Sequence, residues 1–307
     1  MTALTLPRRR RRDVEKPLVE GTIDIGDQRL GFCEFGARGG RPVFWMHGTP
    51  GAKRQLAPLA KQHAAEHDIR VIGLDRPGVG FSTPQRYGAV VDFAADVERV
   101  ADTLGLDRFG VVGLSGGGPY ALACAHQLGD RVTAVGVLGG VAPATGDEAA
   151  PGGVTALAPI FSGSLRAAEP VLGPPLQLLS LGMTPLADVL YPVVHRLMGA
   201  SDRRVLDEPG VADMFIDDIL LGFRHGGLGA VLQDVVLFGR DWGFRVRDVT
   251  HPVHWWHGVD DAIVPFAHGE HMSRLLPNCT FAPFPGGAHL CGYLVADDVL
   301  DAVTAER

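Results

Sequence analysis

The sequence predicts an α/β fold: a mostly parallel central sheet with helices on both faces and a helical cap inserted near the middle of the chain. Short runs of β-branched and apolar residues alternate with polar stretches of helical length. This alternation stops after Gly140, and strand-like runs return only at Pro252. The residues at 141–238 are rich in Leu, Ala, Gly and Pro and indicate short helices. We therefore expect one α/β core that a helical segment interrupts.

The strands are expected in two groups. Thr22–Ile25 and Leu30–Phe35 alternate around a Gly26-Asp27 turn, which predicts a hairpin. The runs that follow are apolar on both faces, as is typical of strands buried within a parallel sheet. They are Val43–Met46, Arg70–Leu74, Phe109–Leu114 and Val132–Leu138 and, after the insertion, Pro252–Trp256 and Thr280–Phe284.

Helices are expected between these strands, where they would cover the sheet. In the stretch Val90–Leu104 the apolar residues fall on one helical face, with acidic residues elsewhere. The other predicted helices are Arg54–Glu66, Pro119–Leu128, Phe266–Leu276 and a terminal helix from about Gly292.

We expect three parts in the chain. Residues 1–17 would form a disordered basic tail, residues 18–141 and 239–307 the α/β core, and residues 142–238 the helical cap. The tail contains the run Arg8–Arg12, but no apolar segment follows it, so an export signal is not expected. No apolar run reaches the roughly 18 residues of a membrane span, so stable membrane insertion is not expected either.

Charge and cysteine content narrow the possible partners and location. The net charge is −7 even though the arginine run is included, so a folded body this acidic is a poor partner for nucleic acid. The four cysteines are scattered and include no CxxC pair, which fits reduced thiols and a cytoplasmic location. The pattern His63-Ala64-Ala65-Glu66-His67 matches a zinc-peptidase motif, but the helix ends at once and no third ligand is evident. We expect no metal.

The run Gly113-Leu114-Ser115-Gly116-Gly117 is the candidate nucleophile site. It follows one predicted strand and opens the helix that begins at Pro119. A serine on such a sharp strand-to-helix turn is strained, and its neighbours must lack a Cβ for strand and helix to approach. The spacing therefore predicts that Ser115 is an exposed nucleophile.

A nucleophilic serine needs a base, and the base needs a group that orients it. His289 lies in a Gly-Gly-Ala-His loop after one predicted strand, and the adjacent Asp260 and Asp261 lie in a loop after another. Loops at the carboxyl ends of parallel strands meet at one edge of the sheet, where ligands bind. We expect Ser115, Asp261 and His289 to form a catalytic triad there, with Asp260 as the alternative acid.

Together these segments resemble the α/β-hydrolase superfamily, in the form of a serine hydrolase with a helical cap. The resemblance rests on five segments, which are His47–Gly51, Asp75–Ser82, the Ser115 pentapeptide, His257–Pro265 and the loop that ends at His289. It aligns Asp261 with the family's acid. It also implies an oxyanion hole formed by the backbone N–H groups of Gly116 and Thr49, since Pro50 has no N–H. His47, Asp75 and Arg76 would support these loops.

The resemblance implies a carboxylesterase-like serine hydrolase that cleaves a carboxylic ester or a related acyl bond through an acyl-enzyme on Ser115. The apolar cap favours a small hydrophobic acyl substrate. No cofactor is implied. Proline iminopeptidases are the alternative, but they typically carry Gly at the position of Thr49 and Trp at that of Gly116. Such a peptidase would need acidic cap residues to hold a free amine, and Glu169, Asp213, Asp217 and Asp218 are available. A catalytically silent ligand-binding protein is the third possibility.

Overall fold

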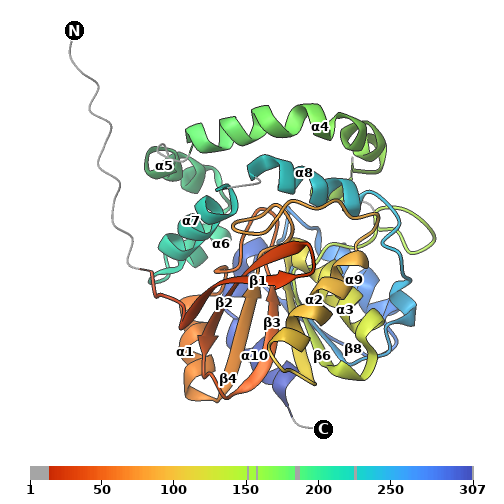
Figure 1. Cartoon of the computed structure of the whole chain (residues 1–307). Helices are drawn as coiled ribbons and strands as arrows, with labels where there is room; N and C mark the ends of the chain where they lie inside the picture. The colour runs from red at the N-terminus through yellow and green to blue at the C-terminus, as the bar shows by residue number, and fades with distance from the viewer. Residues whose placement is uncertain (1–13, 151, 157, 184–186, 225–226, 306–307) are drawn as a thin grey trace.

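The computed structural model describes residues 14–150, 152–156, 158–183, 187–224 and 227–305 (Figure 1). Residues 1–13 of the predicted basic tail lie outside this range. The described strands form one eight-stranded sheet in the order β1-β2-β4-β3-β5-β6-β7-β8. Their bounds are β1 Val19–Ile25, β2 Gln28–Gly36, β3 Arg41–Met46, β4 Ile69–Leu74, β5 Phe109–Leu114, β6 Val132–Leu138, β7 Val253–Gly258 and β8 Cys279–Phe284.

The sheet is mostly parallel, as predicted. Only the pairs β1–β2 and β2–β4 are antiparallel, and the five remaining pairs of neighbours are parallel. Every residue of the central strand β5 is buried, because helices cover both faces of the sheet there. The predicted α/β-hydrolase architecture is confirmed.

Two layers of helices enclose this sheet. On one face α1 (Pro58–Glu66) packs beside α10 (Ala296–Thr304). The other face is covered by α2 (Asp92–Thr103), α3 (Gly118–Leu128) and α9 (Phe266–Leu275). The buried side of α2 consists of the apolar residues predicted to share one face, among them Phe93, Val97 and Val100. α1 begins at Pro58 and not at Arg54, because proline suits the first helical turn.

Between β6 and β7 the described residues form five more α-helices, and we refer to them as the inserted helices. They are α4 (Ala158–Met183), α5 (Ala187–Leu197), α6 (Ala200–Leu206), α7 (Val211–Gly222) and α8 (Gly227–Phe238). Figure 1 shows α4 at the top of the molecule, with α8 between α4 and the sheet. The inserted helices therefore lie over one end of the core.

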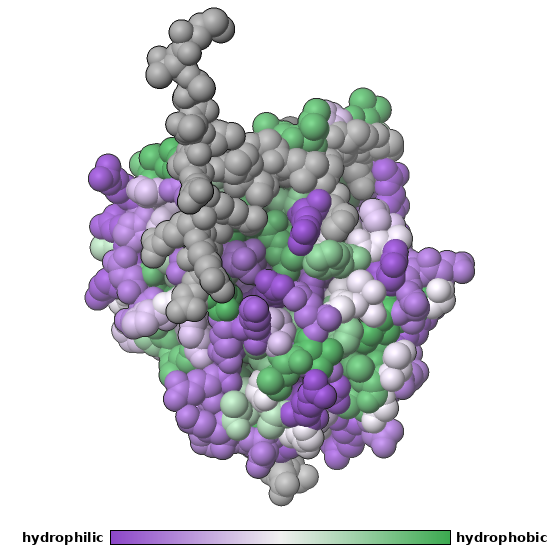
Figure 2. Space-filling view, turned by 60° about the vertical axis from the view of Figure 1, so that its left-hand side comes forward, coloured by the Kyte–Doolittle hydropathy of each residue, from purple (hydrophilic) through white to green (hydrophobic). Residues whose placement is uncertain are grey.

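The outer surface of the inserted helices is more apolar than expected for a helix packed onto a core. Leu178 on α4 and Leu197 on α5 are 73% and 83% exposed, and Val171 and Val189 are also exposed. Figure 2 shows hydrophobic residues at this upper surface of the molecule. Among the helices of the described residues, none is long and apolar enough to cross a membrane. The four cysteines are free thiols.

Candidate active site

Ser115 lies on a sharp turn between β5 and α3. Its φ of +52° is in the left-handed region, which is uncommon for a residue with a side chain. The flanking glycines make this turn possible. A Cβ on Gly113 would lie 2.5 Å from the carbonyl oxygen of Gly117, and a Cβ on Gly117 would lie 2.2 Å from that of Met46. The sequence spacing therefore reflects close backbone contacts around Ser115.

The structure brings Ser115, His289 and Asp261 into one hydrogen-bonded chain, although they come from three separate loops. His289 Nδ1 lies 2.7 Å from Asp261 Oδ2, and His289 Nε2 lies 2.9 Å from Ser115 Oγ. A carboxylate can only accept, so Nδ1 donates to Asp261 and leaves Nε2 free to accept the Ser115 hydroxyl proton. This arrangement can activate a serine for attack on a carbonyl.

The carboxylate of Asp261 is fixed on both oxygens. Oδ1 accepts hydrogen bonds from the backbone N–H groups of Ile263 and Val264, each at 2.9 Å. Oδ2 accepts from His289 and lies 3.5 Å from Nε2 of the buried His257. Burial alone would raise the pKa of Asp261, but the hydrogen bonds from His257, His289 and Val264 outweigh it and hold the pKa well below its usual range.

The neighbouring Asp260 points elsewhere. Its side chain is exposed, and its backbone N–H donates to the carbonyl of Gly287 at 2.9 Å. The geometry thus pairs Asp261, and not Asp260, with His289.

Thr49 and Gly116 lie together beside Ser115. A Cβ on Gly48 would come within 3.4 Å of the Ser115 Cβ, and a Cβ on Gly116 within 2.5 Å of Thr49 Oγ1. The loop after β3 therefore packs directly on the serine turn. This is the place where backbone N–H groups could meet a developing oxyanion.

Buried polar groups support these loops. Asp75 accepts hydrogen bonds from the backbone N–H of Lys53 at 2.9 Å and from its ammonium at 2.8 Å. Arg76 donates to the carbonyls of His47 at 2.6 Å and Gly48 at 3.1 Å. Burial, together with the charge of Arg76, lowers the pKa of His47 well below its usual range, so the ring stays neutral. These contacts give His47, Asp75 and Arg76 the supporting role expected of them.

The prediction missed Asp234, which bonds to the Thr49 loop, and Tyr120, which bonds to Asp234. Asp234, on α8, accepts hydrogen bonds from Thr49 Oγ1 at 2.5 Å and from Tyr120 Oη at 2.7 Å. The sequence does set Asp234 apart, because it is the single charged residue in the apolar run 227–238. A carboxylate on such a helix needs a buried partner.

Two of the acidic residues proposed for binding a substrate amine are already engaged. Asp218 is fully buried and accepts hydrogen bonds from the backbone N–H groups of Ala52 at 2.7 Å and Arg54 at 2.9 Å. Asp217 lies 3.0 Å from the Arg54 guanidinium. The side chain of Glu169 lies outside the described residues.

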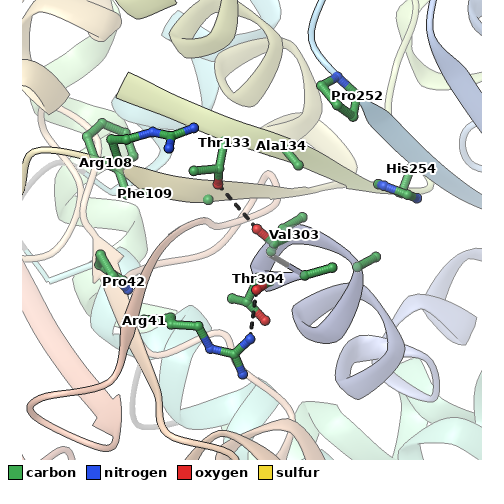
Figure 3. A pocket seen from close by; sticks show the side chains of 13 residues that line it. Arg41, Pro42, Arg108, Phe109, Thr133, Ala134, Pro252, His254, Val303 and Thr304 are labelled. Carbon is green, nitrogen blue, oxygen red and sulfur yellow. Dashed lines mark hydrogen bonds between the residues drawn. The ribbon is translucent and has the colours of Figure 1, made fainter. Parts of the chain in front are cut away.

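A cavity of about 360 Å³ lies at the opposite end of the sheet, near the amino ends of β5 and β6 (Figure 3). Two of its polar side chains bond to the carboxyl end of α10. Arg41 donates to the carbonyl of Thr304 at 2.7 Å, and Thr133 donates to that of Val303 at 3.3 Å. These bonds satisfy carbonyls that the last turn of a helix leaves unpaired. The cavity is thus remote from the serine site and part of its wall is structural.

Comparisons with known proteins find a matching family model, relatives by sequence and similar solved structures. Residues 41–155 match the family model described as the alpha/beta hydrolase fold. A proline iminopeptidase from Xanthomonas citri is 34% identical over 123 residues, which cover 36% of this chain. The chain spans only 39% of the length of that relative.

The structural likenesses extend over nearly the whole chain. An esterase from Thermogutta terrifontis has a TM-score of 0.66 and 23% identity, covering 93% of this chain and 96% of the other. An esterase from Rhodococcus sp. also has a TM-score of 0.66, at 20% identity, covering 94% and 98%. At this identity the likeness establishes the fold alone.

Proposed function

This chain has the α/β-hydrolase fold, and from that premise we propose that it is a serine hydrolase that cleaves a carboxylic ester through an acyl-enzyme on Ser115. The observation that carries the proposal is the hydrogen-bonded chain Ser115–His289–Asp261 at a serine held in a left-handed conformation. The proposal needs no cofactor, because each role in the reaction has a side chain or backbone group to fill it.

The first step forms the acyl-enzyme. Ser115 Oγ attacks the ester carbonyl carbon while His289 Nε2 takes the hydroxyl proton. The electron pair of the carbonyl moves to its oxygen, which the N–H groups of Gly116 and Thr49 would stabilise. When the intermediate collapses, the ester C–O bond breaks and His289 gives its proton to the leaving alcohol.

The second step releases the acid. Water gives a proton to His289 and attacks the acyl carbon, and the bond to Ser115 Oγ then breaks as the serine regains its proton. Asp261 holds the imidazole in the tautomer that both steps require, and it stabilises the imidazolium that forms in each.

An ester fits this site better than a prolyl peptide. The proline iminopeptidases that the sequence resembles typically carry Trp where this chain has Gly116. Here even a Cβ would lie 2.5 Å from Thr49 Oγ1 and 3.1 Å from the ring of Phe238, so there is no room for such a residue. In addition, Asp217 and Asp218 already bind groups of the core, as described above. The sequence match to an iminopeptidase keeps that activity as the second candidate.

A substrate panel after active-site labelling tests the function. We expect a fluorophosphonate to add once to the protein, as read by intact mass. p-Nitrophenyl esters of graded chain length should then be cleaved with a kcat/KM at least about 100-fold above that of a prolyl amide. The reverse preference would favour an iminopeptidase. A folded protein that neither reacts with the fluorophosphonate nor cleaves any panel member would instead be a silent binding protein.

Substituting Gly116 with alanine is expected to lower kcat by about 10- to 100-fold. The new Cβ would overlap Thr49 Oγ1, and this hydroxyl is too firmly bonded to move aside at little cost. The loop after β3 would therefore shift away from the serine. Steady-state kinetics on the best ester measures the effect. Gly163→Ala, where a Cβ meets nothing within 4 Å, is the matched control and should stay within about twofold of wild type. Equal activity of the two variants would contradict the assigned position of the oxyanion hole.

A further inference from the structure

We infer that Asp234, on the inserted helix α8, is a positioning residue that holds the Thr49 loop in the geometry an oxyanion needs. This inference rests on the proposed function, since it concerns the same site. Within the part of the chain that the structure describes, Asp234 bonds to Thr49, Arg76 and Tyr120, and not to Ser115 or His289. It would act through Thr49, whose backbone N–H is one of the two proposed oxyanion donors.

Asp234 accepts hydrogen bonds from three different parts of the core. Oδ2 accepts from Thr49 Oγ1 at 2.5 Å and from Arg76 Nη2 at 2.6 Å. Oδ1 accepts from Tyr120 Oη at 2.7 Å and from Arg76 Nε at 3.3 Å. Thr49 follows β3, Arg76 follows β4, and Tyr120 lies on α3 just after the serine turn. One carboxylate on α8 therefore ties together the segments that surround Ser115.

Arg76 also binds the backbone of the Thr49 loop. Its guanidinium donates to the carbonyls of His47 and Gly48 and, at 2.9 Å, to Thr49 Oγ1. Both partners of the Arg76–Asp234 ion pair are almost completely buried. A buried ion pair of this kind is sensitive to substitution, because removing either charge leaves the other desolvated and unpaired. The position of Thr49 is thus fixed from the side chain, through Asp234, and from the preceding carbonyls, through Arg76.

The inserted helices hold the neighbouring loops in the same way. Asp218 on α7 binds the backbone N–H groups of Ala52 and Arg54, directly after the Thr49 loop. Asp202 on α6 accepts from the backbone N–H of Leu290 at 2.7 Å, next to His289. Packing of the inserted helices on the core therefore fixes the positions of the loops that form the site. Among these contacts, Asp234 is the one that reaches a proposed oxyanion donor.

Asp234→Asn is the variant that tests this role. All the groups that bond to Asp234 now donate to it, and an amide has one acceptor oxygen where the carboxylate has two. Arg76 can only donate and it binds both carboxylate oxygens, so its N–H groups face the amide NH₂ whichever way the amide turns, and Arg76 loses its counter-charge. We expect kcat to fall by about 10- to 100-fold with little change in KM. We also expect the Ki of a trifluoromethyl ketone, whose serine adduct places an oxyanion in the hole, to rise by a similar factor.

Controls separate positioning from loss of structure. Asp207→Asn neutralises an exposed carboxylate at the end of α6 and should leave kcat and Ki unchanged. If Asp234→Asn does not fold, the kcat and the Ki of the Thr49→Val variant test the inference in its place. This variant keeps the backbone N–H and removes only the hydroxyl that Asp234 binds. Where both fold, the double variant should lose less than the product of the single losses.

The outcomes distinguish this inference from the proposed function. A wild-type protein that neither reacts with fluorophosphonate nor cleaves esters would overturn the proposed function, and this inference with it. An active wild type together with a folded Asp234→Asn variant of unchanged kcat and Ki would overturn this inference alone. A folded variant that shows only a higher KM would do the same, because a displaced oxyanion donor acts on the transition state.

Discussion

Ser115→Ala is expected to lower kcat for ester hydrolysis by about 10⁴-fold or more without disturbing the fold. The substitution removes the one atom that would form the acyl bond and leaves the His289–Asp261 pair in place. Alanine is smaller than serine and takes the φ of +52° no less readily, so the turn between β5 and α3 should persist. Steady-state kinetics and intact mass after fluorophosphonate treatment measure the effect, with the melting temperature as the check on folding.

The matched control for this experiment is Ser273→Ala on α9. Its hydroxyl donates to the carbonyl of Glu270 within the same helix, far along the chain from the serine turn. This variant should be labelled and should turn over like wild type. A Ser115→Ala protein that still gained the fluorophosphonate mass, or kept more than about a hundredth of the wild-type kcat, would place the nucleophile elsewhere.

The turn around Ser115 could be predicted because its geometry depends on the spacing of a few neighbouring residues. The glycines at 113 and 117 are required by backbone atoms within 2.5 Å of where their Cβ atoms would lie. The meeting of Ser115, Asp261 and His289 followed from a general property of parallel sheets, since all three lie in loops at the carboxyl ends of strands. The choice between Asp260 and Asp261 was harder, because the two are adjacent and loop residues have no periodicity that fixes their direction.

The contacts between the inserted helices and the core could not be predicted in the same way. Asp234 is 185 residues from Thr49, 158 from Arg76 and 114 from Tyr120, and no local pattern links these positions. The lone charge on α8 indicated a buried partner without saying which one. Hydropathy also did not indicate which apolar side chains of the inserted helices face the core and which face solvent. Leu178 and Leu179 lie in an apolar stretch of the kind that usually packs onto a core, yet they are 73% and 53% exposed.

Asp261→Asn is expected to lower kcat by about 10⁴-fold while the protein stays folded. Asp261 Oδ1 accepts two backbone N–H groups, so an asparagine would keep its oxygen there and turn its NH₂ toward His289. Nδ1 of His289 would then have to accept a hydrogen bond, which moves the ring proton to Nε2. A protonated Nε2 cannot take the proton of Ser115. The loss should therefore appear in kcat, with fluorophosphonate labelling slowed to match.

The adjacent Asp260→Asn is the matched control, because it makes the same chemical change one residue away on an exposed side chain. It should keep kcat within about twofold of wild type.

The pH profile adds a second test. The pKa of Asp261 is already held below its usual range, so its carboxylate stays ionised as the pH falls through the usual range for Asp. The stabilisation it gives to the imidazolium should therefore persist there, and be lost only as the pH falls through the depressed pKa of Asp261. If Asp260→Asn lost far more activity than Asp261→Asn, the loop would have to present Asp260 to His289. The two backbone bonds that now fix Asp261 would then belong to a different conformation.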